Sequence, residues 1–154
     1  NQEPMFVTCS ADRTIKVTHL FNKSEVEIVE FFHSGKSNIA LQKYITTIDI
    51  ITCLAVTSDD KYLISGSADK TISIYDLEER APLSKIKGYH QGNFNEKWKS
   101  SDVSLLGWVL SLAISPDNKI LYSCSADSSL KVFDIATAKL LYSQENVHKG
   151  SCFC

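Results

Sequence analysis

One eight-residue motif occurs three times in this chain, and it restricts the possible folds more than any other feature. The copies lie at residues 10–17, 67–74 and 125–132, and each begins with Ser-Ala-Asp. They follow one another at intervals of 57 and 58 residues. A near-constant interval between three copies indicates a repeat architecture, in which each copy belongs to one supersecondary unit.

Each copy of the motif reads as a tight turn followed by a strand. The carboxylates of Asp12, Asp69 and Asp127 can accept hydrogen bonds from backbone N–H groups a few residues further on, which closes such a turn. The residues after each aspartate alternate between apolar and polar, as in 72–74 and 130–132. This period of two predicts a half-buried strand.

Further β-rich runs surround each copy, so that each complete repeat reads as four antiparallel strands. The other expected strands are residues 5–9, 25–32, 51–56, 62–66, 82–87, 109–114, 120–124 and 139–144. Polar turns such as Ser115-Pro116-Asp117 separate some of them. No segment has a convincing helical pattern, and the predicted fold class is all-β.

The second and third copies, with their flanks, resemble the WD-repeat family of β-propellers. The resemblance extends over residues 58–77 and 115–135, from a polar turn through Leu-x-Ser-x-Ser-x-Asp to an aromatic-Asp pair, Tyr75-Asp76 or Phe133-Asp134. The first copy has Thr18-His19 where the aromatic-Asp pair is expected. The resemblance implies a WD-repeat-like propeller fragment of about two and three-quarter blades.

The chain departs from the family pattern in two ways. Its repeats are about 15 residues longer than the family's typical 40–45. The family's signature Trp, which joins a His, a Ser or Thr and the turn Asp in a buried hydrogen-bonded group, is replaced by Tyr75 and Phe133. Because a Phe cannot donate a hydrogen bond, we expect Asp127 to depend on backbone N–H groups alone.

The expected organisation is one partial β-propeller over residues 1–154. Its parts are an incomplete blade at 5–32, blades at 50–88 and 107–145, the start of a next blade at 146–154, and insertions at 33–49 and 88–107. So few blades would leave apolar sheet faces uncovered, so we expect the remaining blades to come from the same chain or from another. The absence of an initial Met agrees with the expectation of further upstream sequence.

The charge balance, the apolar runs and the cysteine count limit the kinds of partner and location that we expect. Sixteen basic against 18 acidic residues give a net charge of −2, which argues against a nucleic-acid binder. No apolar run approaches the roughly 20 residues that would cross a membrane, and no secretion signal is visible. The five cysteines are odd in number and irregular in spacing, which favours free thiols and an intracellular location.

The insertion at 88–107 combines aromatic and basic residues, which are common at protein interfaces. The candidate partner-binding residues are Tyr89, His90, Phe94, Lys97, Trp98 and Lys99. The resemblance places this connection on the same rim as the turn aspartates. A purely structural alternative is that Trp98 and Trp108 cover their own propeller edge while the lysines are solvated. A second functional alternative is a reader of an anionic or phosphorylated ligand, with Lys85 and Lys87 added to the lysine cluster.

Nothing in the chain predicts an enzyme, a cofactor or a metal site. It has no Gly-x-Ser-x-Gly nucleophile elbow and no glycine-rich phosphate loop. His148, Cys152 and Cys154 supply only three local ligands, and 148–150 reads better as the lead into a further blade. Cys9, Gly66 and Cys124 stand at the same position of the three repeats, which indicates a packing site for a small side chain.

The resemblance therefore implies a non-catalytic scaffold that binds other proteins through its rim loops. We expect it to act in a multi-subunit assembly, in the cytoplasm or in a cytoskeletal or ciliary structure.

Overall fold

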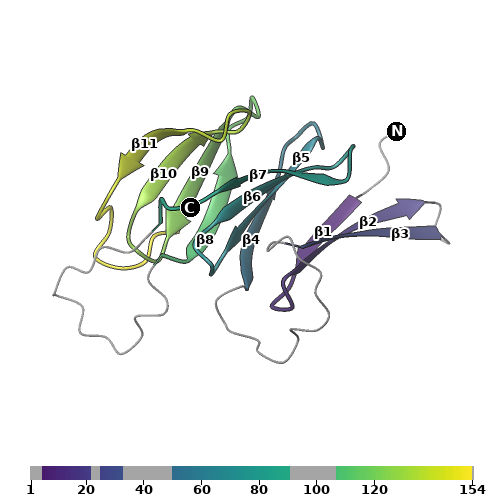
Figure 1. Cartoon of the computed structure of the whole chain (residues 1–154), viewed down its shortest axis with the longest axis horizontal. Coiled ribbons are helices and arrows are strands. Elements are labelled where there is room, and N and C mark those ends of the chain that lie inside the picture. The colour runs from purple at the N-terminus through teal and green to yellow at the C-terminus, as the bar shows by residue number, and fades with distance from the viewer. Residues whose placement is uncertain (1–4, 22–24, 33–49, 91–106, 154) are drawn as a thin grey trace.

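The computed structural model describes residues 5–21, 25–32, 50–90 and 107–153, and these residues form three antiparallel sheets that follow one another across the molecule (Figure 1). The described residues are all-β, as predicted, and contain no helix. Accordingly, no helix of the described chain is long and apolar enough to cross a membrane.

Each sheet is one blade, with its strands in chain order. Blade 1 has three described strands, β1 (Met5–Cys9), β2 (Thr14–Phe21) and β3 (Glu25–Phe32). Blade 2 has four, β4 (Ile51–Val56), β5 (Tyr62–Ser67), β6 (Ile72–Asp76) and β7 (Ala81–Ile86). Blade 3 also has four, β8 (Val109–Ile114), β9 (Ile120–Ser125), β10 (Leu130–Asp134) and β11 (Leu140–Gln144).

Alternation along the strands gives blade 2 two apolar faces. In blade 2, Leu63 and Tyr75 are paired across β5 and β6 and point towards blade 1, where they pack with Ile15 and Val17. We call this side the backward face. The neighbouring pair, Ile64 and Ile74, lies on the opposite side of the sheet, which we call the forward face.

The forward face of blade 2 is covered by the backward face of blade 3. Ile64 and Ile74 share one buried cluster with Leu121 and Phe133, and all four are 0% exposed. Burying each such side chain stabilises the fold by about 1.5–3 kcal/mol. The contact between successive blades is therefore the core of the molecule.

A small slot between the first two strands of blade 2 and of blade 3 is filled in two different ways. In blade 2, Cys53 of β4 is paired with Gly66 of β5, and a Cβ atom on Gly66 would lie 2.6 Å from the Cys53 sulfur. In blade 3, the corresponding pair is Ser111 and Cys124. The cysteine sulfur comes from the first strand in blade 2 and from the second strand in blade 3. Each slot therefore has room for one cysteine side chain opposite a smaller residue.

Polar bonds also join blades 2 and 3. The Thr52 hydroxyl donates to the backbone carbonyl of Val109. At the opposite end of the blades, the side-chain oxygen of Asn118 accepts a hydrogen bond from the Ser58 backbone N–H at 2.9 Å. The Asn118 side-chain amide donates to the Ser58 hydroxyl, also at 2.9 Å. Asn118 has a left-handed backbone (φ 59°), which aspartate and asparagine tolerate better than most residues.

The chain after β11 returns to the edge of blade 3. The Cys152 N–H donates to the Ser125 carbonyl at 3.0 Å, and the Ser128 hydroxyl donates to the Gly150 carbonyl at 2.7 Å. Cys152 is buried against blade 3, much as Val109 lies against Gly66 of blade 2. The described residues from 145 to 153 form no strand, so the strand expected to contain Cys152 is not formed there.

Candidate functional site

The three Ser-Ala-Asp turns have the same geometry in each blade. The carboxylate of Asp12 accepts from the Thr14 N–H at 2.9 Å, that of Asp69 from the Thr71 N–H at 2.9 Å, and that of Asp127 from the Ser129 N–H at 3.0 Å. The hydroxyls of the same three partners donate at 2.6, 2.6 and 2.5 Å. In all three turns, a backbone N–H and a hydroxyl of the residue two positions after the aspartate therefore donate to the same carboxylate.

The residue after each aspartate has a left-handed backbone. The φ angles are 73° at Arg13, 70° at Lys70 and 65° at Ser128. The carboxylate bonds compensate for this sparsely populated conformation of non-glycine residues. The result is one rigid corner per blade, all three on the rim where β5–β6 and β9–β10 turn.

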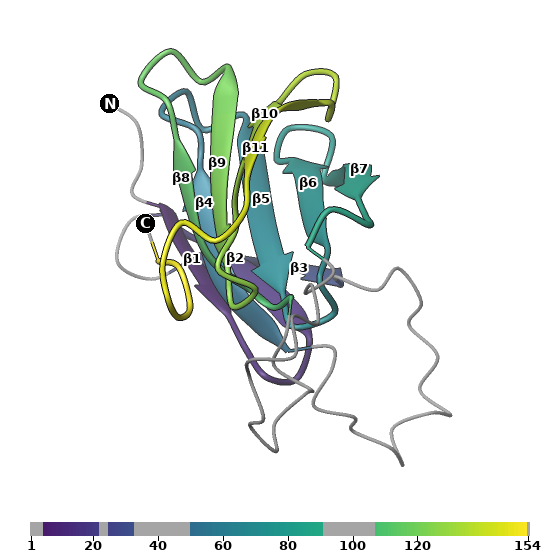
Figure 2. The ribbon, with the colours of Figure 1, turned by 90° about the vertical axis from the view of Figure 1, so that its left-hand side faces the viewer.

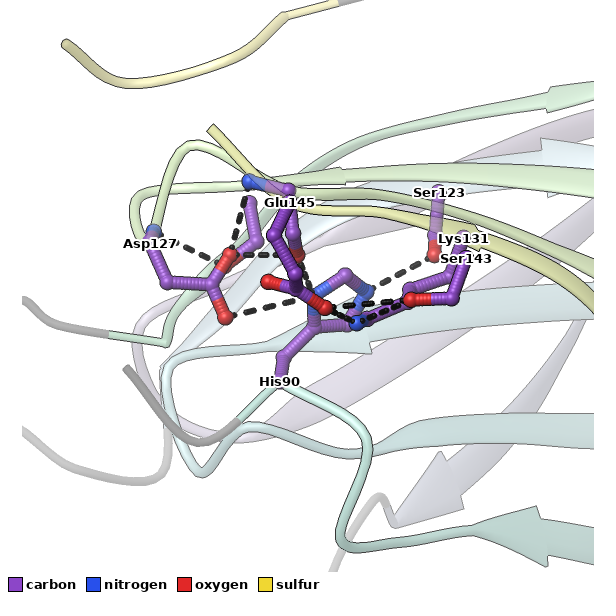
Figure 3. A network of polar contacts seen from close by, with 8 residues as sticks. His90, Ser123, Asp127, Lys131, Ser143 and Glu145 are labelled. Carbon is purple, nitrogen blue, oxygen red and sulfur yellow. Dashed lines mark hydrogen bonds and ion pairs between the residues drawn. The ribbon is translucent and has the colours of Figure 1, made fainter. Parts of the chain in front are cut away.

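In blade 3 the turn aspartate belongs to a buried polar network, drawn in Figure 3. His90 Nε2 lies 2.8 Å from the Ser123 hydroxyl, and His90 Nδ1 lies 2.9 Å from the Ser129 hydroxyl. The same Nδ1 is 3.6 Å from the Asp127 carboxylate. Since the Ser129 hydroxyl uses its proton on Asp127, Nδ1 is the donor to Ser129.

This network corrects the expectation that Asp127 would depend on backbone N–H groups alone. Phe133 does stand at the position of the family's Trp, fully buried and unable to donate. His90 and the Ser129 hydroxyl nevertheless reach Asp127. Burial by itself raises the pKa of Asp127, but the hydrogen bonds from His90 and Ser129 outweigh it and hold that pKa well below its usual value.

The chain of Ser123, His90 and Asp127 has the connectivity of a nucleophile, base and orienting acid. Ser123 is 0% exposed and His90 is 2% exposed. Within the described residues, both side chains are therefore shielded from solvent, and their hydrogen bonds hold His90 beside the Asp127 turn.

In blades 2 and 3, a lysine and a serine face each other across the last two strands, but the strand that carries the lysine differs between the blades. In blade 2, Ser73 of β6 faces Lys85 of β7, and the Lys85 ammonium lies 3.2 Å from Asp69. In blade 3, Lys131 of β10 faces Ser143 of β11. The buried Lys131 donates to Ser143 at 2.7 Å and also to Glu145, beside the His90 network in Figure 3.

The predicted partner-binding residues divide into two groups. Phe94, Lys97, Trp98 and Lys99 lie outside the described residues. Tyr89 is 39% exposed, and its ring packs edge to face with that of Phe133, with the ring centroids 5.3 Å apart.

The other described members of this predicted set differ in accessibility. His90 is buried among hydroxyls and does not face solvent. The alternative of an anionic-ligand reader adds two lysines to this set. Lys87 is exposed, whereas Lys85 forms an ion pair with Asp69.

The two described ends of the second insertion meet at the rim. A Cβ atom on Gly107 would lie 2.6 Å from the His90 carbonyl oxygen and 2.9 Å from Cδ of Lys70. Gly107 has φ +93°, which also favours glycine. The next residue, Trp108, accepts a hydrogen bond at its carbonyl from the Ala126 N–H at 2.9 Å. We call this arrangement of His90 and Gly107 the neck.

The neck holds residues 90 and 107 in contact between the Asp69 turn of blade 2 and the Asp127 turn of blade 3. Sequence reasoning did not assign His90 to the buried network. The sequence signal that could have identified His90 is its repeat position. His148 and Cys152 lie close together at the start of the next repeat, whereas the insertion separates the corresponding residues, His90 and Val109.

Within the described residues, no group of three His, Cys, Asp or Glu side chains could hold a metal ion. Cys152 is buried and His148 is exposed. Cys154 lies outside the described part of the chain.

Comparison with known proteins identifies the repeats. The family model described as "WD domain, G-beta repeat" matches residues 42–76 and 102–134, each match ending at the aromatic-Asp pair. The nuclear distribution protein PAC1 of Scheffersomyces stipitis is 27% identical over 161 residues, which cover 84% of this chain and 29% of that protein.

Two other relatives are also similar to most of this chain. Eukaryotic translation initiation factor 3 subunit I of Candida glabrata is 26% identical over 124 residues, which cover 80% of this chain and 30% of that protein. Striatin-3 of Rattus norvegicus is 25% identical over 130 residues, which cover 84% and 13%. The chain thus spans less than a third of the length of each of these relatives.

Proposed function

Because this chain carries repeats of the WD family, we propose that it is a non-catalytic scaffold segment that binds partner proteins through the rim bearing the turn aspartates. The neck is the observation that supports this proposal. It anchors both described ends of the insertion at 88–107 between two rigid turns. A loop on such a support can bind a partner without disturbing the blade.

The described residues near the neck suit a protein partner. Tyr89 is exposed and held against Phe133, and Lys87 is exposed beside it. Aromatic anchors and cations are frequent among the residues that dominate binding energy. We include Phe94, Lys97, Trp98 and Lys99 in this proposed surface and leave out His90, which is buried.

We further propose that the protein acts inside the cell as a member of a multi-subunit assembly. The relatives that match most of this chain include a nuclear distribution protein and a subunit of a translation initiation factor. The four described cysteines are free thiols, which suits a reducing compartment.

The proposal is tested by removing the insertion at its neck. Since His90 and Gly107 are already in contact, residues 91–106 can be replaced by a short Gly-Ser linker. Cross-linking and mass spectrometry would compare the partners recovered with the intact chain, with this deletion, and with Trp98→Ala combined with Lys97→Glu and Lys99→Glu. We expect both changes to reduce recovery of the same partners.

A charge-matched control is Lys61→Glu with Lys119→Glu. Both lysines are exposed on the turns at the opposite end of blades 2 and 3. Equal recovery from the intact chain and the loop variants would remove the insertion from the binding surface.

A further inference from the structure

One position in each blade is covered by a residue from the part of the chain that follows the blade. It is occupied by Cys9 in blade 1, Gly66 in blade 2 and Cys124 in blade 3, each directly before a Ser-Ala-Asp turn. Cys9 packs against the buried cluster that contains Ile51, the first residue of β4. Gly66 is covered by Val109, the first residue of β8. The same contact is therefore made at two successive blades.

At blade 3 the covering residue is Cys152. Its backbone N–H donates to the carbonyl of Ser125, the residue after Cys124, at 3.0 Å. Gly150 accepts from the Ser128 hydroxyl at 2.7 Å, and Figure 2 shows this last part of the chain in yellow, running back along blade 3. Cys124 is 1% exposed and Cys152 is 2% exposed. Here a cysteine of the blade is covered by a second cysteine.

A sulfur atom in this slot reaches the residue that covers it. In blade 2 the sulfur belongs to Cys53, and it lies 3.7 Å from the carbonyl oxygen of Val109. In blade 3 a serine, Ser111, stands on the first strand, and the sulfur belongs to Cys124 on the second. The cysteine of blade 3 thus stands at the position of Gly66, on which the covering residue packs directly.

The spacing of the equivalent pair in blade 2 suits a disulfide bond. A Cβ atom built on Gly66 would lie 3.0 Å from the Cβ atom of Val109. The Cβ atoms of a disulfide lie about 3.5–4.5 Å apart. A pair of cysteines at these two positions therefore needs to separate by only about 1 Å from this spacing to adopt disulfide geometry. In the structure, Cys124 and Cys152 are not joined by a disulfide.

From this arrangement we propose that Cys124 and Cys152 are a redox-active pair, whose disulfide joins the segment after β11 to blade 3. The oxidant is a peroxide, and the reaction proceeds when the contact opens locally, because both thiols are buried. One thiolate attacks the O–O bond of hydrogen peroxide, which yields a sulfenic acid and one water. The other thiolate attacks the sulfenic sulfur and releases a second water. The two thiols lose two protons and two electrons in total, and a dithiol reductant reverses the bond.

The test is disulfide mapping of the folded chain after treatment with hydrogen peroxide. Every sample carries Cys154→Ser, which removes a competing thiol two residues from Cys152. Remaining thiols are alkylated, and the peptides are identified by mass spectrometry. We expect the bridge between Cys124 and Cys152 to exceed any other pair of cysteines by roughly tenfold, because the fold holds these two thiols at a high effective concentration. Dithiothreitol should remove the bridge.

Two variants separate this pair from the other thiols. Cys152→Val places at this contact the residue that covers Gly66 in blade 2, and it should abolish the bridge while keeping the contact packed. Cys53→Ser is the matched control, since it removes the thiol of the corresponding slot in blade 2 and should leave the bridge unchanged. Near-ultraviolet circular dichroism would verify that both variants keep the packed aromatic residues of the parent.

The same oxidation in concentrated urea shows whether the fold directs the reaction. The unfolded chain should give a mixture of cysteine pairs, because nothing then holds two particular thiols together. The proposal would be overturned by a folded chain whose thiols all stay reduced, by bridges between chains only, or by a mixture equal to that of the unfolded chain.

Discussion

His90 is the residue on which the buried polar atoms of blade 3 depend. It bonds two hydroxyls and lies beside the Asp127 carboxylate, all of them shielded from water. His90→Ala would remove one partner from each of these buried groups, so we expect the free energy of unfolding to fall by about 2–4 kcal/mol. Urea denaturation measures the change. His148→Ala, at an exposed histidine, is the control and should stay within about 0.5 kcal/mol of the parent. Equal effects of the two substitutions would contradict this role.

Asp127 makes a pH-dependent contribution whose sign follows from its lowered pKa. Because the folded-state pKa lies below the ordinary value of 3.8, ionised Asp127 stabilises the fold above that pH, and the contribution is lost as the pH falls below it. We expect the stability difference between the parent and Asp127→Asn to be constant near neutrality. It should shrink from about pH 4 downward. Denaturation at a series of pH values measures this, and a difference that grows on acidification would disprove it.

The turn aspartates could be predicted from sequence because their bonds are local. Asp127 and Ser129 are two residues apart, and the same pattern recurs twice. His90 meets Ser123 and Ser129 across 33 and 39 residues. The position of His90 in the network depends on how blades 2 and 3 pack. The insertion also separates His90 from the next strand, which hides its repeat position in the sequence.

At the scale of strands, the slot beside Gly66 couples two residues. A Cβ atom there would lie 2.6 Å from both the Cys53 sulfur and a Val109 methyl group. We expect Gly66→Ala to destabilise the fold by about 1–3 kcal/mol through overpacking. Adding Cys53→Ser, as Ser111 accompanies Cys124 in blade 3, should recover part of this loss. A double-mutant cycle by urea denaturation measures the coupling. Strictly additive effects would show that the slot is not shared.

Strand positions followed well from alternation and turn chemistry. β1, β4 and β8 cover the expected residues 5–9, 51–56 and 109–114. The last strands were displaced by a residue at their ends, since β7 runs from Ala81 to Ile86 against an expected 82–87. Both β7 and β11 contain a register shift, which no period-two pattern reveals. The Lys85 and Lys131 contacts were also beyond prediction, because they depend on which strand faces which.

At the scale of the whole molecule, the contact between blades 2 and 3 should make these two blades unfold together; blade 3 lies in front of blade 2 in Figure 2. Ile74 of blade 2 and Phe133 of blade 3 belong to one buried cluster, and both are 0% exposed. We expect Ile74→Ala to lower the free energy of unfolding by about 2–5 kcal/mol, because it leaves a cavity in this contact. Urea denaturation measures the change, and Leu83→Ala, at a residue that is 52% exposed, is the control. Equal effects of the two substitutions would contradict the importance of this contact.

The hydrogen bonds between Ser58 and Asn118 have a consequence for any blade that packs on the forward face of blade 3. In blade 3 the position of Ser58 is taken by Pro116, which has no N–H to donate to a neighbouring blade. A contact on that face would therefore lack the backbone hydrogen bond that joins blades 2 and 3. Under mechanical load, we expect such a contact to open before the contact between blades 2 and 3 does.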